Sequence, residues 1–216
     1  MNYHSISLAD RIFEKLEDDI IQGVIPTKDI ITEVRIADSL GVSRTPIREA
    51  FRRLEQESLI RDIGKGYLVL GITKENLIDI MDIRILLEPL ASFYAAKNIT
   101  PDGIKKLKDI LDLQEFYSGK QDIDRLREED EVFHDAICEL SGRTVIAETL
   151  LPLHRKTRMY RRLSIENNIR RSSSLEEHKQ IFNAISSSDC ELAAELTAEH
   201  VKRAKKNMEE RLGYNG

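Results

Sequence analysis

The stretch GVSRTPIREA, residues 41–50, predicts the start of a helix with two very different faces. Ser43 can cap this helix, roughly residues 44–57, and Pro46 falls in its first turn, where a missing N–H costs little. One face forms a basic stripe with a spacing of four residues: Arg44, Arg48 and Arg52. The other face suits a small core: Ile47, Ala50, Phe51 and Leu54. An arginine stripe beside a free helix N-terminus suits the major groove of DNA, where the hydroxyls of Ser43 and Thr45 can contact phosphates.

The segments around this helix are short and change in type. Before it, a helix over roughly 8–22 is followed by a shorter helix that Thr32 caps and Gly41 ends. After it, two β-type runs within residues 59–70 surround a glycine-rich tip at Lys65, which predicts a hairpin. The order helix, helix, turn, helix and hairpin predicts a winged helix-turn-helix. Lys65 at the tip is a candidate for the minor groove.

Beyond a short linker at residues 71–73 the β pattern disappears. Pro89 lies inside the first long helical pattern of this part and predicts a kink. The predicted helices cover roughly 74–98, a segment opened by Thr100-Pro101, 123–140, 144–163, 174–186 and 190–212. The sequence therefore predicts a mostly α protein, with a winged helix-turn-helix over residues 1–72 and an all-helical bundle over residues 73–216.

Composition limits the surroundings in which this chain can work. The formal net charge of −5 excludes an evenly basic protein, so any nucleic-acid surface must be a local patch on an acidic body. No apolar run approaches the roughly 20 residues of a membrane helix, and no secretory signal is visible at the N-terminus. The two cysteines, Cys138 and Cys190, form no disulfide framework. We therefore expect a cytoplasmic protein with no membrane partner.

Residues 8–70 resemble the GntR family of bacterial transcription regulators. The resemblance is carried by Thr32-Glu33, Ile36-Ala37, residues 40–50, Leu54 and Gly64-Lys65-Gly66. In that family, the arginines that match Arg44 and Arg48 and the wing glycine that matches Gly66 contact operator DNA. The pattern and the resemblance together give a set of candidate DNA-binding residues: Arg35, Ser43, Arg44, Thr45, Arg48, Arg52, Lys65 and Gly66.

The chain departs from this family at one candidate position. Directly after the glutamate of the second helix, many members carry an arginine that contacts a base, and this chain has Val34 there, with Arg35 next to it. Two interpretations are open: Arg35 takes over after a small adjustment of the turn, or the operator is read differently at that position.

Three of the predicted helices each carry a histidine on their apolar side: His134, His178 and His200. Asp130 precedes His134 by one helical turn and therefore faces the same way. A single histidine in such a place is usually a hydrogen-bonded core residue. Three of them with a carboxylate need a shared explanation, because buried ionisable groups are costly unless they are paired or bind a metal. Imidazoles with one carboxylate suit a first-row divalent ion, and both explanations stay open on the residues alone.

Residues 75–212 resemble the FCD domain, the effector-binding and dimerisation domain of the FadR branch of the GntR family. Its marks are Arg84-x3-Glu88, Asp130-x2-Phe133-His134, Glu177-His178, Ala184-Ile185 and Ala193-x6-His200. In metal-binding FCD domains the matching aspartate and three histidines are the ligands. The resemblance therefore implies a divalent transition metal, such as zinc, nickel or manganese, at Asp130, His134, His178 and His200. Open coordination positions would then receive water or an effector carboxylate.

Arg84 and Glu88 are separated by one helical turn and have two interpretations. The simpler one is an ion pair on the helix surface. The FCD resemblance implies instead that Arg84 reaches into the pocket and binds a small organic acid. Arg158 and Arg161 are weaker candidates for that role, and His154 shows no partner pattern.

Three functions fit these features. The first is a ligand-responsive transcription regulator, in which a small acid bound near a metal alters operator binding. The second is a metal sensor, and the third is a metal-dependent enzyme. Nothing in the sequence nominates a general base or nucleophile beyond the ligands, so we expect no enzyme. One winged domain reads only a few base pairs, and we therefore expect a homodimer on an inverted repeat.

Overall fold

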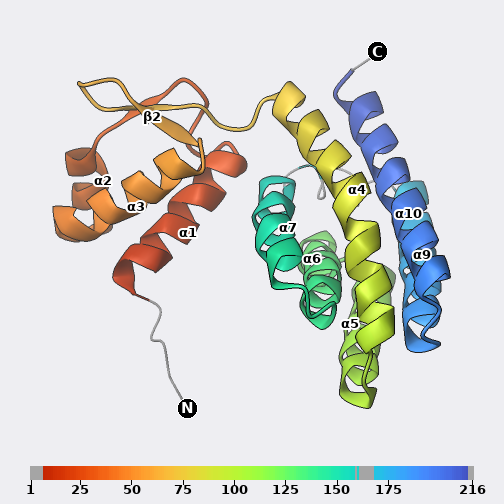
Figure 1. Cartoon of the computed structure of the whole chain (residues 1–216). Coiled ribbons are helices and arrows are strands. Elements are labelled where there is room, and N and C mark those ends of the chain that lie inside the picture. The colour runs from red at the N-terminus through yellow and green to blue at the C-terminus, as the bar shows by residue number, and fades with distance from the viewer. Residues whose placement is uncertain (1–6, 159, 161–167, 214–216) are drawn as a thin grey trace. The chain divides into compact units, whose positions relative to one another are not determined.

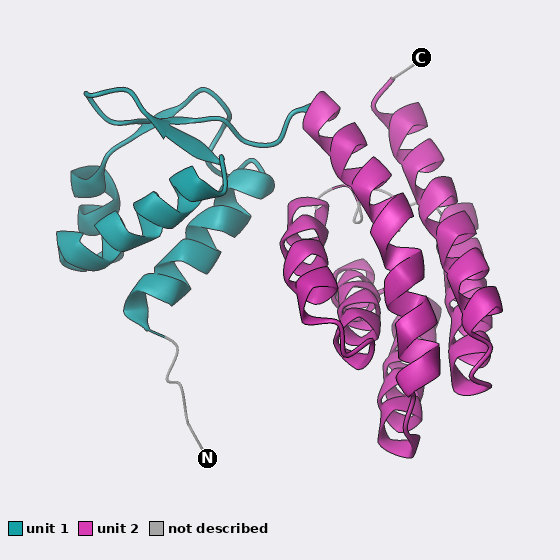
Figure 2. Ribbon diagram, viewed as in Figure 1, with its two compact units in different colours: residues 1–73 teal, residues 74–216 magenta. Residues whose placement is uncertain are grey.

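The structure is a computed structural model that describes residues 7–158, 160 and 168–213. The chain divides into two compact units, Met1–Thr73 and Lys74–Gly216, which Figure 2 shows in different colours. Each unit has its own buried core, and each is described by itself below. The fold class predicted from the sequence, a winged helix-turn-helix with a helical bundle after it, is confirmed.

The first unit combines three helices with a small sheet. Its elements are α1 (Leu8–Ile21), β1 (Ile30–Ile31), α2 (Glu33–Leu40), α3 (Arg44–Gln56), β2 (Ile60–Asp62) and β3 (Tyr67–Val69). The sheet is antiparallel with the order β1-β3-β2, and Ile31 pairs with Tyr67. The predicted two-stranded hairpin is therefore incomplete, because β1 adds a third strand directly before α2. A run of two isoleucines is too short to show the alternation that marks a strand.

Apolar residues of α3 form the centre of this unit. Ile47, Ala50, Phe51 and Leu54 are fully buried, as their shared helix face predicts. The Phe51 ring meets the Tyr67 ring edge-on at 4.9 Å, which ties α3 to the sheet. The opposite face of α3 is thereby held outward.

Two turns fix how α2, α3 and the hairpin meet. Gly41 ends α2 in the left-handed conformation, with φ of 66°. Ser43 occupies the N-cap position of α3, but in the described part of the chain its side chain makes no capping hydrogen bond, contrary to the prediction. Gly66 has φ of 147°, and a Cβ atom there would lie 2.9 Å from the carbonyl oxygen of Ile31. A glycine is therefore required where the hairpin passes β1.

The second unit is an all-helical bundle. Its elements are α4 (Lys74–Asn98), α5 (Pro101–Lys120), α6 (Ile123–Leu140), α7 (Thr144–Lys156), α9 (Asn168–Ser186) and α10 (Cys190–Arg211). The predicted helix over 144–163 was too long within the described residues, because α7 ends at Lys156, and the predicted end near 163 lies outside the described residues. The predicted start of the next helix near 174 was too late, because the described part of α9 already includes Asn168. Residues 161–167, which include Arg161, lie outside the described residues.

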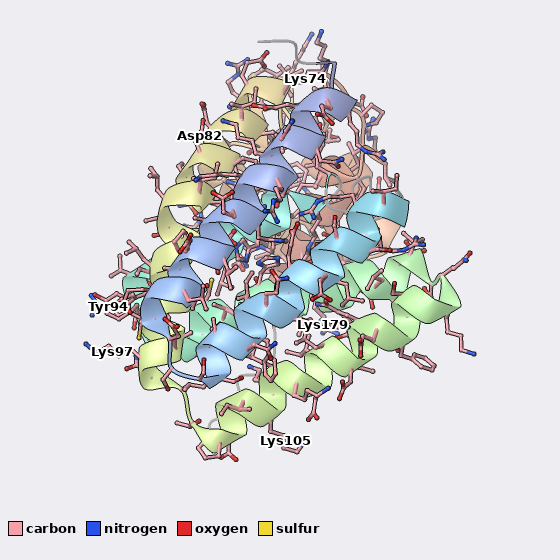
Figure 3. All side chains as sticks on the ribbon, turned by 90° about the vertical axis from the view of Figure 1, so that its right-hand side faces the viewer. Lys74, Asp82, Tyr94, Lys97, Lys105 and Lys179 are labelled. Carbon is pink, nitrogen blue, oxygen red and sulfur yellow. The ribbon has the colours of Figure 1, made fainter. Side chains whose placement is uncertain are left out.

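Helices α4 and α10 run side by side along one face of the bundle (Figure 1). Their facing edges are joined by polar contacts at the end shown uppermost in Figure 3, where Lys74 and Asp82 are labelled. The Lys74 Nζ donates to the carbonyl oxygen of Leu212 at 2.7 Å, and the Lys205 Nζ donates to Asp82 Oδ1 at 2.5 Å. The apolar core of the bundle is built largely from alanines of α4 and larger side chains of α5, α6 and α9, among them Leu107, Phe133 and Ile181. Within the described residues, no helix is long and apolar enough to cross a membrane.

Candidate functional site

The basic stripe of α3 is exposed and meets a single carboxylate from α2. Arg44 and Arg48 have side chains that are 58% and 66% exposed, whereas the Glu33 side chain is 13% exposed. Arg48 donates from Nε to Glu33 Oε1 at 3.0 Å and from Nη2 to Oε2 at 3.1 Å. Arg44 donates from Nη2 to the same Oε2 at 3.0 Å. The arginine stripe was predicted from spacing, but the carboxylate that joins two of its members was not.

This ion-pair cluster changes the proton affinity of both partners. The hydrogen bond from Arg48 lowers the pKa of the Glu33 carboxyl, and the bond from Arg44 adds to this effect against the opposing effect of partial burial. The same contact raises the pKa of Arg48. Glu33 is therefore ionised and accepts from two guanidinium groups at once at neutral pH.

The remaining candidate DNA-binding residues lie on the outside of the first unit. Arg35 donates from Nη2 to Asp29 Oδ2 at 3.0 Å, so its side chain is paired with a residue directly before β1. Val34 is exposed at the start of α2. The side chains of Ser43, Thr45, Arg52 and Lys65 are also exposed, and Gly66 is half-buried against β1. The structure thus leaves the hydroxyls, Arg52 and the wing lysine available on the surface.

Three buried histidines converge in the second unit. His134 comes from α6, His178 from α9 and His200 from α10, and they are 4%, 1% and 4% exposed. One nitrogen from each ring can be chosen so that all three atoms lie within 4.8 Å of one another. The ring centroids are 4.7–5.1 Å apart. The structure brings these predicted residues together, and their role as ligands stays a prediction.

Each of the three rings is oriented by a different acceptor on its Nδ1 side. The Nδ1 of His200 lies 2.7 Å from Glu177 Oε2, and the Nδ1 of His178 lies 2.9 Å from Gln114 Oε1. The Nδ1 of His134 lies 3.3 Å from an oxygen of Glu88. An Nδ1–H that donates to such an acceptor leaves Nε2 as the basic nitrogen, which is the arrangement found around metal-binding histidines.

Asp130 lies beside this histidine cluster. Its Oδ1 is 3.7 Å from the Nε2 of His178, and the residue is buried one turn before His134 on α6. Among the described residues, the close group that could hold an ion comprises the three histidines, and Asp130 is at its edge.

Glu177 supports the cluster from behind His200. Burial raises the pKa of its carboxyl, but the His200 hydrogen bond and the Arg170 charge outweigh this effect, and the pKa falls to about 2. Arg170 donates to Oε2 at 2.9 Å and Arg203 donates to Oε1 at 3.2 Å. Glu177 was noticed in the sequence only as the neighbour of His178. Gln114 and Glu88 had no spacing that linked them to the histidines.

Glu88 is the centre of a second buried polar chain. Arg84 donates from Nε to Glu88 Oε1 at 2.5 Å, and both side chains are buried, so the interpretation as a helix-surface ion pair was wrong. His154 shows no partner pattern in the sequence, but in the structure its Nε2 is 3.1 Å from Glu88 and its Nδ1 is 2.6 Å from Asp135. Burial raises the pKa of Glu88, yet Arg84 and the two histidines hold it well below its usual range.

A cavity adjoins both polar groups. Its volume is about 550 Å³, including the space at its mouth. The polar residues on its wall include Arg84, Asp130, His134, Arg170, Arg171 and His200. Arg158, the weaker candidate, instead donates from Nε to both carboxylate oxygens of Glu131, at 2.8 and 2.9 Å. The cavity therefore places two of the histidines and Asp130 on the same wall as Arg84.

Residues 8–69 match the model of bacterial regulatory proteins, gntR family, and residues 79–203 match the FCD domain. The Nta operon transcriptional regulator of Aminobacter aminovorans is 32% identical over 158 residues, which cover 69% of this chain and 75% of that protein. The gluconate operon transcriptional repressor of Bacillus subtilis (strain 168) is 32% identical over 131 residues. The chain spans about half, 54%, of that relative's length, and 61% of the chain is covered.

The solved structure of E. coli McbR/YncC has the same fold, with a TM-score of 0.81 at 22% identity, covering 96% of this chain and 99% of that one. The FCD match alone covers more than half of the chain. By these matches the chain belongs to the GntR family of bacterial DNA-binding transcription regulators and carries an FCD domain.

Proposed function

We propose that this chain is a ligand-responsive regulator in which a small organic acid, bound beside a divalent metal ion in the helical unit, changes the binding of a homodimer to operator DNA. The observation that carries the proposal is the convergence of three oriented histidines, two of which lie on the wall of a cavity that also contains Arg84. A DNA-binding protein needs no such cavity for binding alone.

The donor set fits a first-row divalent ion such as zinc, nickel or manganese. His134, His178 and His200 would supply nitrogen atoms, and Asp130 would supply an oxygen. Glu88, Gln114 and Glu177 orient the rings from their Nδ1 sides, which fixes the tautomer that coordination needs. A bound ion would supply positive charge and open coordination positions facing the cavity. This fit favours the ligand role over that of three separate core histidines.

The cavity wall favours an acidic effector. Arg84, Arg170 and Arg171 contribute positive charge to it. Arg84 donates from Nη1 to Thr157 Oγ1 at 3.2 Å and to Met81 Sδ at 3.3 Å, both neutral acceptors. A carboxylate is a stronger acceptor for a guanidinium than a hydroxyl or a thioether. We therefore propose Arg84 as the effector anchor, with Glu88 holding its Nε in place.

In the first unit we propose that Arg44 and Arg48 contact bases in the major groove. Arg52 and the hydroxyls of Ser43 and Thr45 would contact phosphates, and the wing at Lys65 and Gly66 would enter the minor groove. Arg35 is bonded to Asp29, so it would have to leave that partner to reach a base. Two copies on an inverted repeat would supply the base pairs that one unit lacks.

The test is the double variant His134→Ala with His178→Ala in the full chain. We expect loss of bound metal, a lower melting temperature and no response of operator binding to organic acids, while DNA binding without effector is kept. The operator probe is a duplex selected from a randomised library with the unmodified chain. Unchanged metal content in the double variant would falsify the site.

A matched control removes a buried hydrogen bond of the same bundle without replacing a histidine or a residue that is hydrogen-bonded to one. Ser92 and Thr197 join α4 and α10 through their hydroxyls at 2.7 Å. The variant Ser92→Ala with Thr197→Val should lower the melting temperature but keep the metal. This control separates loss of the ion from general destabilisation.

The metal-sensor function is distinguished by titrating metal salts and organic acids separately. If metal alone changes operator binding fully and no acid adds to it, the ion is the signal. The cationic cavity wall favours the acid as the signal.

A further inference from the structure

We propose that Glu33 is a positioning residue that sets base specificity, because it holds the guanidinium groups of Arg44 and Arg48 in the orientation that reads bases. This inference rests on the proposed base contacts of those two arginines. Glu33 itself is not among the residues that we propose to contact DNA.

The contacts use one edge of the Arg48 guanidinium and leave another edge available. Its Nε and Nη2 donate to the two oxygens of Glu33, which is a bidentate side-on pair. A guanidinium has five N–H donors in a rigid fork, and the edge formed by Nη1 and Nη2 still has donors to offer. That edge presents two parallel N–H donors, which can meet the O6 and N7 acceptors of guanine. Glu33 thus occupies one edge of the Arg48 guanidinium and leaves the other available for guanine.

The position of Glu33 makes this arrangement a property of the fold. It is the first residue of α2, directly after the N-cap Thr32, whose side chain accepts a hydrogen bond from the Arg35 backbone N–H at 3.2 Å. Arg44 and Arg48 are one turn apart on α3, so both can reach one carboxylate from the same side. The Glu33 side chain is mostly covered while both arginines stay exposed. The acid therefore lies beneath the arginines rather than between them and solvent.

Ordering the arginines before DNA arrives has a predictable benefit. Long side chains lose rotamer freedom when they bind, and a preformed pair removes part of that loss from the binding step. The benefit applies only where a guanidinium must meet a base edge in one orientation. Contacts to phosphate, which tolerate many orientations, gain little from it.

Removal of the Glu33 charge should therefore affect the specific and the non-specific affinity for DNA differently. A negative charge near DNA normally weakens binding, so its loss should leave non-specific affinity unchanged or raise it. Specific affinity should fall, because Arg48 and Arg44 lose their orientation. A purely electrostatic role raises both affinities, and a purely structural role of Glu33 at the start of α2 lowers both.

The experiment compares the full chain with Glu33→Gln and with Asp38→Asn. Asp38 lies on the same helix and is exposed, so it matches the change in charge. The probes are a duplex selected with the unmodified chain and a scrambled duplex of equal length, at fixed salt. For Glu33→Gln we expect the ratio of specific to non-specific affinity to fall about tenfold. For Asp38→Asn we expect the ratio to stay as it is. A ratio that does not change in Glu33→Gln, or that falls equally in Asp38→Asn, overturns the inference.

A double-mutant cycle with Arg48→Ala shows whether Glu33 acts through that arginine. The loss of specific affinity caused by Glu33→Gln should be smaller when Arg48 is already absent, and an equal loss overturns the inference. If Arg48→Ala alone leaves specific affinity unchanged, the proposed recognition helix is wrong. If Arg48→Ala lowers specific affinity and Glu33→Gln does not, the recognition helix stands and only the role of Glu33 fails.

Discussion

The chain contains two arginine–glutamate pairs of the same chemistry in opposite surroundings. In the first unit, Arg48 and Glu33 meet at the surface, where the arginine side chain is 66% exposed. In the second unit, Arg84 and Glu88 meet in the interior, where the side chains are 6% and 4% exposed. Water screens the surface pair, so the pair adds little to the stability of the fold. The interior pair is shielded from water, so removal of one member leaves the charge of the other buried without its partner.

The surroundings of the two glutamates differ accordingly. Glu33 accepts from two arginines whose side chains are exposed to solvent. Glu88 accepts from Arg84 and also faces His134 and His154, so each partner depends on the same carboxylate. The lesson is that the surface pair suits recognition of a partner, whereas the buried pair suits the construction of a site. Four predictions test this contrast, beginning with the largest expected effect.

Truncation of the buried acid should be the most damaging change. Glu88→Ala leaves Arg84 inside the bundle without its carboxylate, and removal of one partner of a buried ion pair typically costs about 3–5 kcal/mol of unfolding free energy. Urea denaturation of the full chain measures this loss. Glu33→Ala is the matched surface variant, and we expect it to cost less than about 1 kcal/mol. Equal losses for the two variants would contradict the contrast.

Metal removal should come next in size. A ligand at one hundred times its dissociation constant stabilises the folded state by about 2.7 kcal/mol, so chelation should lower the unfolding free energy by a similar amount. Thermal melting before and after dialysis against a chelator, followed by addition of zinc, measures the change. The variant His134→Ala with His178→Ala should not respond to the chelator. A response equal to that of the unmodified chain would show that the ion binds elsewhere than at these histidines.

Loss of a recognition arginine should affect DNA binding and leave stability nearly unchanged. Arg48→Ala should weaken binding to the selected duplex by roughly 1–3 kcal/mol, the range for a bidentate base contact. Fluorescence anisotropy at fixed salt measures the affinity, and urea denaturation checks that the fold is kept. An unfolding free energy lowered as much as in Glu88→Ala would show that Arg48 is a structural residue.

The wing lysine should give the smallest effect. Lys65→Ala should weaken binding evenly across sequences and reduce the salt dependence by about one released counterion. Anisotropy titrations at several salt concentrations, with selected and scrambled duplexes, measure the slope. A loss confined to the selected duplex would show that Lys65 contributes to sequence reading instead.

Much of the fold could be predicted because its signals are local. Gly41 after the second helix and Pro101 at the start of α5 mark boundaries that the structure reproduces. The histidines could be assigned to inward faces because helical periodicity places them beside apolar residues. The start of α9 was predicted too late because serine is typical of a helix cap, and residues 172–174 are three serines. The described part of α9 already includes Asn168.

The partners of the candidate residues could not be predicted, because they come from elements distant in sequence. Gln114 lies 64 positions before His178, and Glu88 lies 66 positions before His154. Glu33 precedes Arg48 by 15 positions, across a turn. No periodicity relates such pairs, and only the packing of helices brings them together. Sequence patterns thus identify the residues with chemical roles more readily than the residues that orient them.

The shared acceptors of the bundle restrict how this chain can change over generations. The polar chain from Asp135 through His154 and Glu88 to His134 joins α6, α7 and α4. A single substitution within it leaves the neighbouring buried groups without a hydrogen-bond partner. Any one substitution is therefore destabilising, even where a set of substitutions made together would be tolerated. We therefore expect these positions to covary among relatives, each substitution accompanied by another, while the exposed arginines of α3 diversify one at a time as operators change.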